Sequence, residues 1–167
     1  SIMYLGLNTF IVLYFMNHFH ESQNFSNLLL SVYYGIGALF TLIGGKLGDK
    51  HGYRTFVRLG FLLAFPAALI LAWTDSSILG ILCLIVLGAA LNLTYSPMVV
   101  LGQQYLPNRV GLASGITLGL AVSVGGITAP LLGKVGDMYG LETTFCVIAL
   151  ITLIPLISSF TLPKPKK

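Results

Sequence analysis

Long apolar stretches dominate the chain, and short polar segments interrupt them. Each stretch holds roughly 20 residues, enough for an α-helix to cross a hydrocarbon core of about 30 Å. The pattern predicts six membrane-spanning helices, over residues 2–19, 27–45, 56–73, 78–101, 110–133 and 144–162. Turn and charge signals gather in the five connections, residues 21–26, 46–55, 74–77, 103–109 and 134–143. We therefore expect an all-α polytopic membrane protein.

The composition excludes a water-soluble globular protein. Of the 167 residues, 56% are hydrophobic and 8% are charged, whereas an ordinary soluble domain carries about 25% charged residues. So few charged groups could not cover the surface of a globule in water. Six spans with short connections account for the whole length, so we expect no soluble domain and place any activity in or beside the bilayer.

Lysine and arginine are biased toward one side of the predicted bundle. Only Lys134 falls on the other side. The favoured side carries Lys46, Lys50, Arg54, Arg58, Arg109, Lys164, Lys166 and Lys167. Short basic loops are retained in the cytoplasm, so we expect a multi-pass protein of the cell membrane with both termini cytoplasmic. The net charge of +4 then reflects topology, and nucleic acid is not an expected partner because no basic patch is interleaved with exposed aromatics.

A short segment of the chain occurs twice. Residues 45–52, GKLGDKHG, recur 88 positions later at residues 133–140 as GKVGDMYG, with five of eight positions identical. Each copy joins the second and third spans of a three-span unit. Because three is odd, the two units must lie in opposite orientations, which is typical of secondary transporters. We predict two inverted three-helix repeats, about residues 1–75 and 76–162, followed by a basic cytoplasmic tail at 163–167. The alternative is that glycine and aspartate simply favour tight interhelical turns.

The first copy carries a family resemblance. Its motif consists of Gly45, Asp49, Lys50, Gly52 and Arg54. This spacing resembles the motif between the second and third helices of each half of major facilitator superfamily transporters, and it departs from that motif at Tyr53, where a basic residue is usual. Residues 103–115, continued by Gly125 and Gly126, are similar to the C-terminal half of the fosmidomycin resistance subgroup.

The resemblance covers nearly the whole chain and implies a larger partner. A full transporter of this family has twelve spans in two halves, and this chain is similar to spans seven to twelve. The implied partners are a missing N-terminal six-helix half, a small-molecule substrate and the lipid bilayer. The alternative is a six-span half-transporter that assembles with a second copy of itself.

The motif also has a physical interpretation without the family. Asp49 is expected at a helix end, surrounded by Lys50, Arg54 and Arg58, where a carboxylate gains from backbone N–H groups and a helix dipole. Contacts of this kind can form when one side of a transporter closes and break when it opens, which is the gating role that the resemblance implies. The alternative is a topology anchor with a tight turn. The second copy lacks the basic residues, so Asp137 is expected to be structural.

Polar residues at membrane depth are the candidates for a substrate path. They are Asn8 in the first span and Asn92, Tyr95, Ser96 and Gln103 in the fourth. The resemblance implies that these two spans line the central cavity, since each is the first helix of a three-helix unit. The alternative for each residue is an interhelical hydrogen bond. Tyr33 and Tyr34 are expected among the aromatic residues of the membrane interface.

The fifth span carries a stripe of small residues, Gly111, Gly115, Gly119 and Ser123, which predicts a face for close helix packing. No cofactor and no metal site are expected, because the two cysteines lie in apolar runs and no cluster has metal-ligand spacing. No ATP-binding loop is present. The expected function is secondary transport, with efflux of a drug and antibiotic resistance suggested by the subgroup. A membrane-embedded enzyme is the less favoured alternative, because no catalytic constellation lies at membrane depth.

Overall fold

The structure is a computed structural model that describes residues 1–163, and all regular structure in that range is helical. The helices are α1 (Ile2–His18), α2 (Gln23–His51), α3 (Tyr53–Trp73), α4 (Ser77–Tyr105), α5 (Val110–Ser114), the π-helix η1 (Gly115–Leu120), α6 (Ala121–Tyr139), α7 (Leu141–Ile151) and α8 (Leu153–Phe160). Because α5, η1 and α6 are continuous and α7 and α8 are separated by one residue, residues 1–163 form six helical rods.

Five of these rods are long and apolar enough to cross a membrane. The sixth, α1, has 17 residues, or roughly 26 Å at 1.5 Å per residue. The all-α polytopic fold expected from the sequence is confirmed. Residues 164–167, which include three lysines of the predicted tail, lie outside the described residues.

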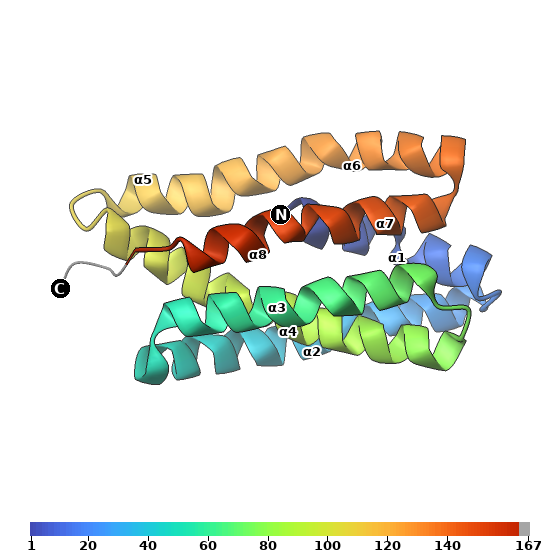
Figure 1. Cartoon of the computed structure of the whole chain (residues 1–167), viewed down its shortest axis with the longest axis horizontal. Coiled ribbons are helices and arrows are strands. Elements are labelled where there is room, and N and C mark those ends of the chain that lie inside the picture. The colour runs from blue at the N-terminus through green and yellow to red at the C-terminus, as the bar shows by residue number, and fades with distance from the viewer. Residues whose placement is uncertain (164–167) are drawn as a thin grey trace.

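The rods lie side by side and alternate in direction along the bundle (Figure 1). The turn at Gly52, the α4–α5 connection and the end of α8 lie at one end of the bundle. The α1–α2 and α3–α4 connections and the turn at Gly140 lie at the other end (Figure 1). We call these the basic end and the acidic end, after the charged residues of their connections. The two copies of the repeated segment therefore lie at opposite ends.

Helices α2 and α3 pack closely on α4 through glycines. A Cβ atom at Gly44 of α2 would collide with the backbone carbonyl of Leu93, and one at Gly60 of α3 would lie 2.7 Å from the carbonyl oxygen of Ala90. In lipid, helices associate through such close backbone approach rather than through burial from water. A larger side chain at either glycine would push α4 away.

The main core lies among α1, α2, α3, α4 and α7 and combines aliphatic with aromatic side chains. Tyr14 and Phe15 of α1 are fully buried, and the ring of Tyr14 lies 4.1 Å from that of Phe145 in α7, measured between centroids. The rod formed by residues 110–139 contributes little to this core. Along it only Ala113, Gly125 and Leu132 are buried. One side of the bundle is thus well packed, and this rod is mostly exposed.

Two predicted connections are wrong. Residues 46–55 and 134–143 are almost entirely helical, because each chain reversal needs only one glycine. Gly52 and Gly140 have φ of +92° and +91°, and their N–H groups donate to the carbonyls of Gly48 and Gly136, each at 2.9 Å. An L-residue rarely adopts such a φ. The helices consequently run beyond the apolar runs that predicted them.

The last span is also interrupted where the sequence predicts one helix. The break at Thr152 lies between α7 and α8. Pro155 has no N–H group to donate to the carbonyl of Ile151, four residues earlier, so the regular ladder fails at this point. The prolines at positions 66, 97 and 130 lie inside helices without such a break.

Candidate functional site

The first copy of the repeated segment, at the basic end, joins the end of α2 to the start of α3 through a side-chain hydrogen bond. Asp49 lies in the last turn of α2, and Tyr53 is the first residue of α3. The Tyr53 hydroxyl donates a hydrogen bond to Asp49 Oδ1. The Tyr53 ring occupies the space beside Gly48, where a Cβ atom would lie 2.5 Å from Cδ1 of the ring. The residue at which the motif departs from its family pattern therefore supplies the partner of Asp49.

The basic residues of this end form no ion pair with Asp49 in residues 1–163. In the described part of the chain, no lysine or arginine lies within ion-pair distance of its carboxylate. Arg58 instead binds the end of α8, donating from Nε to the carbonyl of Ser159 at 2.9 Å and from Nη2 to that of Phe160 at 3.1 Å. The last carbonyls of a helix are unpaired and carry partial negative charge, so they attract a cation. Arg58 is therefore a helix cap.

An open pocket of about 410 Å³ lies at the same end. It is lined by Gly48, Asp49, His51, Gly52, Tyr53, Arg54, Thr55, Leu101 and Gln104. Arg54 Nε is buried and has no hydrogen-bond partner within residues 1–163. The pocket thus combines an exposed carboxylate that can accept hydrogen bonds with a guanidinium group that can donate them.

Two of the predicted substrate-path residues lie between helices. Asn92 is 8% exposed and donates from Nδ2 to the carbonyl of Gly88 at 2.8 Å. Its amide faces Gly37 of α2, where a Cβ atom would lie 2.6 Å from Nδ2. Ser96 faces α2 as well, with Oγ 3.0 Å from the Cβ position of Gly45. These contacts are packing contacts between α2 and α4.

The other predicted path residues point elsewhere. Tyr95 is 46% exposed. Gln103 donates from Nε2 to Ser114 Oγ at 3.0 Å and so joins α4 to α5. Asn8 Oδ1 is buried and has no partner among the described residues. The structure does not bring the five candidates into one site.

Tyr33 was misassigned from the sequence. It is 1% exposed rather than interfacial, because α2 begins at Gln23 and Tyr33 lies almost three turns inside it. Its ring packs beside Gly88 of α4 and lies 6.5 Å from the ring of Tyr4, and its hydroxyl finds no partner in the described chain. The close-packing glycine at position 88 is the sequence signal that could have placed this ring in the interior.

The glycine stripe of the fifth span faces no other part of residues 1–163. A Cβ atom at Gly111, Gly115 or Gly119 would meet nothing within 4 Å. Gly115 also opens the π-helix, which runs to Leu120. Such turns are rare and occur frequently at functional sites, and sequence analysis missed this one. The stripe therefore has no neighbour within residues 1–163, whereas Thr117 of the π-helix packs beside Gly102 of α4.

Comparisons with known proteins identify the family. The protein-family model described as Major Facilitator Superfamily matches residues 1–167. Over 164 residues the chain is 35% identical to an uncharacterized MFS-type transporter, YfnC, of Bacillus subtilis, covering 97% of this chain and 39% of that protein. Over 156 residues it is 32% identical to the fosmidomycin resistance protein of Escherichia coli, covering 93% and 38%.

A third relative, the MFS-type transporter ppzB of Metarhizium majus, is 28% identical over 170 residues and covers 91% of this chain. The chain spans less than two fifths of the length of each of these relatives. The family match extends over all residues of the chain and agrees with the all-α fold and the motif at the basic end. The chain therefore belongs to the Major Facilitator Superfamily.

Proposed function

We propose that the chain forms the C-terminal six-helix half of a secondary transporter that exports a small organic compound or drug. Family membership supports transport over the enzyme alternative. The name of the Escherichia coli relative, fosmidomycin resistance protein, supports efflux. In this proposal the protein resides in the cell membrane, and the basic end faces the cytoplasm.

The observation that carries the proposal is the unpartnered face of the rod 110–139. Its glycines at 111, 115 and 119 have no neighbour within 4 Å of a Cβ position, and large apolar residues beside them are exposed, among them Leu112 at 51% and Leu120 at 59%. Glycines spaced four apart allow another backbone to approach closely in lipid. A lipid-facing rod would gain nothing from such a smooth stripe.

The proposed occupant of this face is a preceding six-helix half of the same protein. The relatives are more than twice as long as the chain, since it spans 39% and 38% of two of them. A second copy of the chain could cover the same face, and this is the alternative assembly.

The motif at the basic end is proposed to act as a gate in alternating access. The bond between Tyr53 and Asp49 links the end of α2 to the start of α3, and the exposed carboxylate of Asp49 leaves oxygen atoms for a partner half. Contacts that exist in only one of two states shift the balance between those states. Gly45, Lys50 and Gly52 complete this gating motif.

The substrate path is proposed to use polar atoms without a partner of their own. Asn8 Oδ1 on α1 and the exposed Tyr95 on α4 are the main candidates. Gln103 lies nearer the basic end of α4. Asn92 and Ser96 then influence the path through the α2–α4 packing in which they take part.

The proposal is tested by substituting a glycine of this face with a bulky residue. Gly115→Leu in the full-length protein should reduce export of fosmidomycin at least about tenfold, because overpacking a helix interface costs typically 1–3 kcal/mol. Fosmidomycin is the probe because of the Escherichia coli relative. The matched control is Gly35→Leu on α2, where a Cβ atom also meets nothing within 4 Å.

Membrane abundance of both variants should stay near that of the unmodified protein. Equal export by Gly115→Leu and the unmodified protein would contradict the proposed interface. The mass of the 167-residue chain in detergent separates the two occupants: a stable dimer that Gly115→Leu dissociates would favour a second copy.

A further inference from the structure

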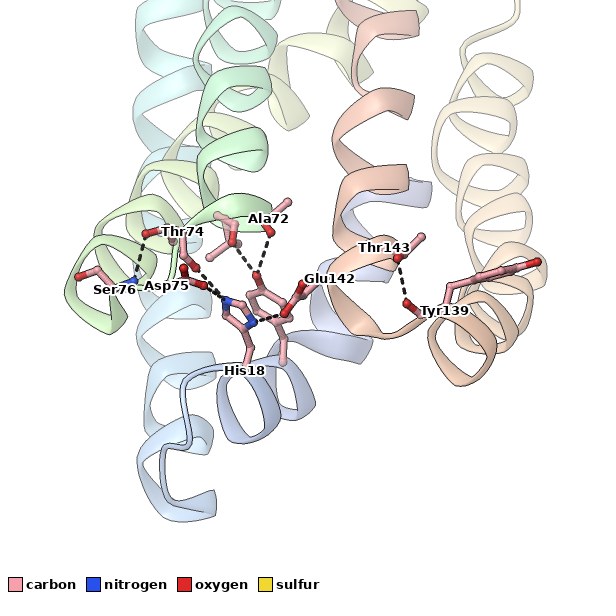
Figure 2. A network of polar contacts seen from close by, with 10 residues as sticks. His18, Ala72, Thr74, Asp75, Ser76, Tyr139, Glu142 and Thr143 are labelled. Carbon is pink, nitrogen blue, oxygen red and sulfur yellow. Dashed lines mark hydrogen bonds and ion pairs between the residues drawn. The ribbon is translucent and has the colours of Figure 1, made fainter.

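A polar network lies at the acidic end, away from the motif, and centres on His18 (Figure 2). The His18 side chain is only 11% exposed. Its Nε2 lies 2.8 Å from the carbonyl oxygen of Thr74, in the α3–α4 connection. Its Nδ1 lies 2.7 Å from Oε1 of Glu142, in the first turn of α7. One imidazole ring thus joins α1 to two other elements.

The two acceptors fix the number of protons in this network. A backbone carbonyl can only accept, so Nε2 must carry a hydrogen and donate it to Thr74. A neutral ring would then present the lone pair of Nδ1 to a carboxylate oxygen at 2.7 Å, and two acceptors at that distance repel each other. A hydrogen must therefore lie between Nδ1 and Oε1. The pair holds one proton more than a neutral histidine beside an ionised glutamate.

Two carboxylates lie beside the ring, one near each nitrogen. Asp75 Oδ1, from the α3–α4 connection, lies 3.7 Å from Nε2. The Glu142 side chain is 64% exposed. No lysine or arginine pairs with either carboxylate within residues 1–163. Each N–H group of a doubly protonated ring therefore has an acceptor in place.

The remaining neighbours hold the ring in place. The Tyr14 ring of α1 stacks on it at 4.9 Å with an interplanar angle of 8°, and the Tyr14 hydroxyl donates to the carbonyl of Leu71 at 2.7 Å. From the α1–α2 connection, Phe19 lies edge-on to the ring. Glu21, which also belongs to the α1–α2 connection, accepts a hydrogen bond from Ser77 Oγ at 2.6 Å and makes no contact with His18.

We propose that His18 and Glu142 form a proton-binding site that clamps α1 to α7 at the acidic end. The ligand is a single proton taken from water, held between Nδ1 and Oε1. When that proton returns to water, the two facing lone pairs repel and the contact between α1 and α7 is released. The site goes beyond the proposed transport function, because it depends neither on the substrate nor on the motif at the basic end.

The first experiment measures where the protons lie. The 167-residue chain is labelled with ¹⁵N-histidine in lipid nanodiscs, and the ring nitrogens are observed by NMR at pH 7.5, about one unit above the ordinary midpoint of a histidine. His18 should show two protonated nitrogens, and the exposed His20 is the internal reference. A neutral His18 ring at this pH would overturn the proposal, and this result needs no variant to fold.

A conservative variant tests the role of the carboxylate. In Glu142→Gln the amide can donate to Nδ1, so the hydrogen bond persists with a neutral ring. The variant should lose the second protonated nitrogen of His18 at pH 7.5. Glu21→Gln, at the same end but without contact to His18, should keep it. An unchanged His18 spectrum in Glu142→Gln would show that Glu142 does not hold the proton.

The clamp has its own readout. Spin labels at Asn17 of α1 and Thr143 of α7 should move apart as the pH rises and His18 loses its proton. The same labels in Glu142→Gln should keep one distance over the pH range in which His18 of the unmodified chain loses its proton, because the neutral hydrogen bond persists there. A distance in the unmodified chain that ignores the protonation of His18 would overturn the clamp and leave a proton site without a mechanical effect.

Discussion

The two copies of the repeated segment share a backbone and differ in side-chain contacts. Gly52 and Gly140 adopt nearly the same φ and make the same hydrogen bond to the fourth residue before them. In the first copy Tyr53 bonds to Asp49. In the second copy Leu141 stands at the position of Tyr53, and its methyl carbon and Thr144 Oγ1 line the space beside Gly136. Asp137 is exposed.

This difference separates what the segment does as a turn from what it does as a contact. The glycine reversal serves both ends of the bundle, because both helix pairs must reverse direction within one residue. The hydrogen bond between Tyr53 and Asp49 belongs to the first copy, at the basic end, where both residues line an open pocket. A gate requires a contact that can be made and broken, so we expect function to be concentrated in the first copy.

The largest expected effect tests the shared turn. Gly52→Ala and Gly140→Ala should each destabilise the bundle by about 1–3 kcal/mol, because alanine at these φ and ψ values is strained. The measurement is thermal unfolding of the chain in detergent, followed by circular dichroism. Similar losses at both positions would confirm one backbone device used twice. An unchanged stability of Gly140→Ala would show that the two glycines do not play the same role.

A smaller effect is expected from the two aspartates. Asp49→Asn keeps the shape but weakens a charge-assisted hydrogen bond, at a cost of about 1 kcal/mol for an exposed group. Export by the full-length protein should fall about fivefold to tenfold with expression unchanged. Asp137→Asn, the matched control, should change export less than twofold. Equal losses in both variants would reduce Asp49 to a turn residue.

The smallest effect concerns the tyrosine hydroxyl. Tyr53→Phe leaves the ring beside Gly48 and removes only the donor to Asp49, so export should fall about twofold to fivefold. Tyr139→Phe, which alters an exposed hydroxyl next to the second turn, should have no effect. In a double-mutant cycle, Tyr53→Phe combined with Asp49→Asn should cost little more than Asp49→Asn alone. Additive losses would mean that the two side chains act separately.

The sequence predicted the order of the helices well, because apolar runs of membrane length have no other stable form in lipid. It also located both glycine turns within the repeated segment. It could not give the helix ends. Helices α2 and α4 have 29 residues each and continue through residues whose polarity indicated a connection, since polar side chains at a bundle end reach water while the backbone stays helical.

The contacts of the candidate site were harder to predict. Charge and spacing placed Arg58 beside Asp49, but the free carbonyls of α8 lie about 100 positions later in the sequence and compete for it. Helical spacing placed Asn92 and Ser96 on one stripe, and they do share a face, but periodicity cannot say whether that face meets a cavity or a neighbouring helix. The face meets a neighbouring helix because glycines of α2, Gly37 and Gly45, leave space for Asn92 and Ser96.

The length of α2 and α4 couples the molecule to the thickness of its membrane. Twenty-nine residues extend about 44 Å, against a hydrocarbon core of about 30 Å, so we expect several residues at the helix ends to lie among the lipid headgroups. We expect Asp49, in the last turn of α2, to lie in the headgroup layer. Lipids with longer acyl chains would bring hydrocarbon toward that carboxylate, and the bundle would have to tilt or thin the bilayer around it. The same polypeptide would therefore work differently in thin and thick membranes.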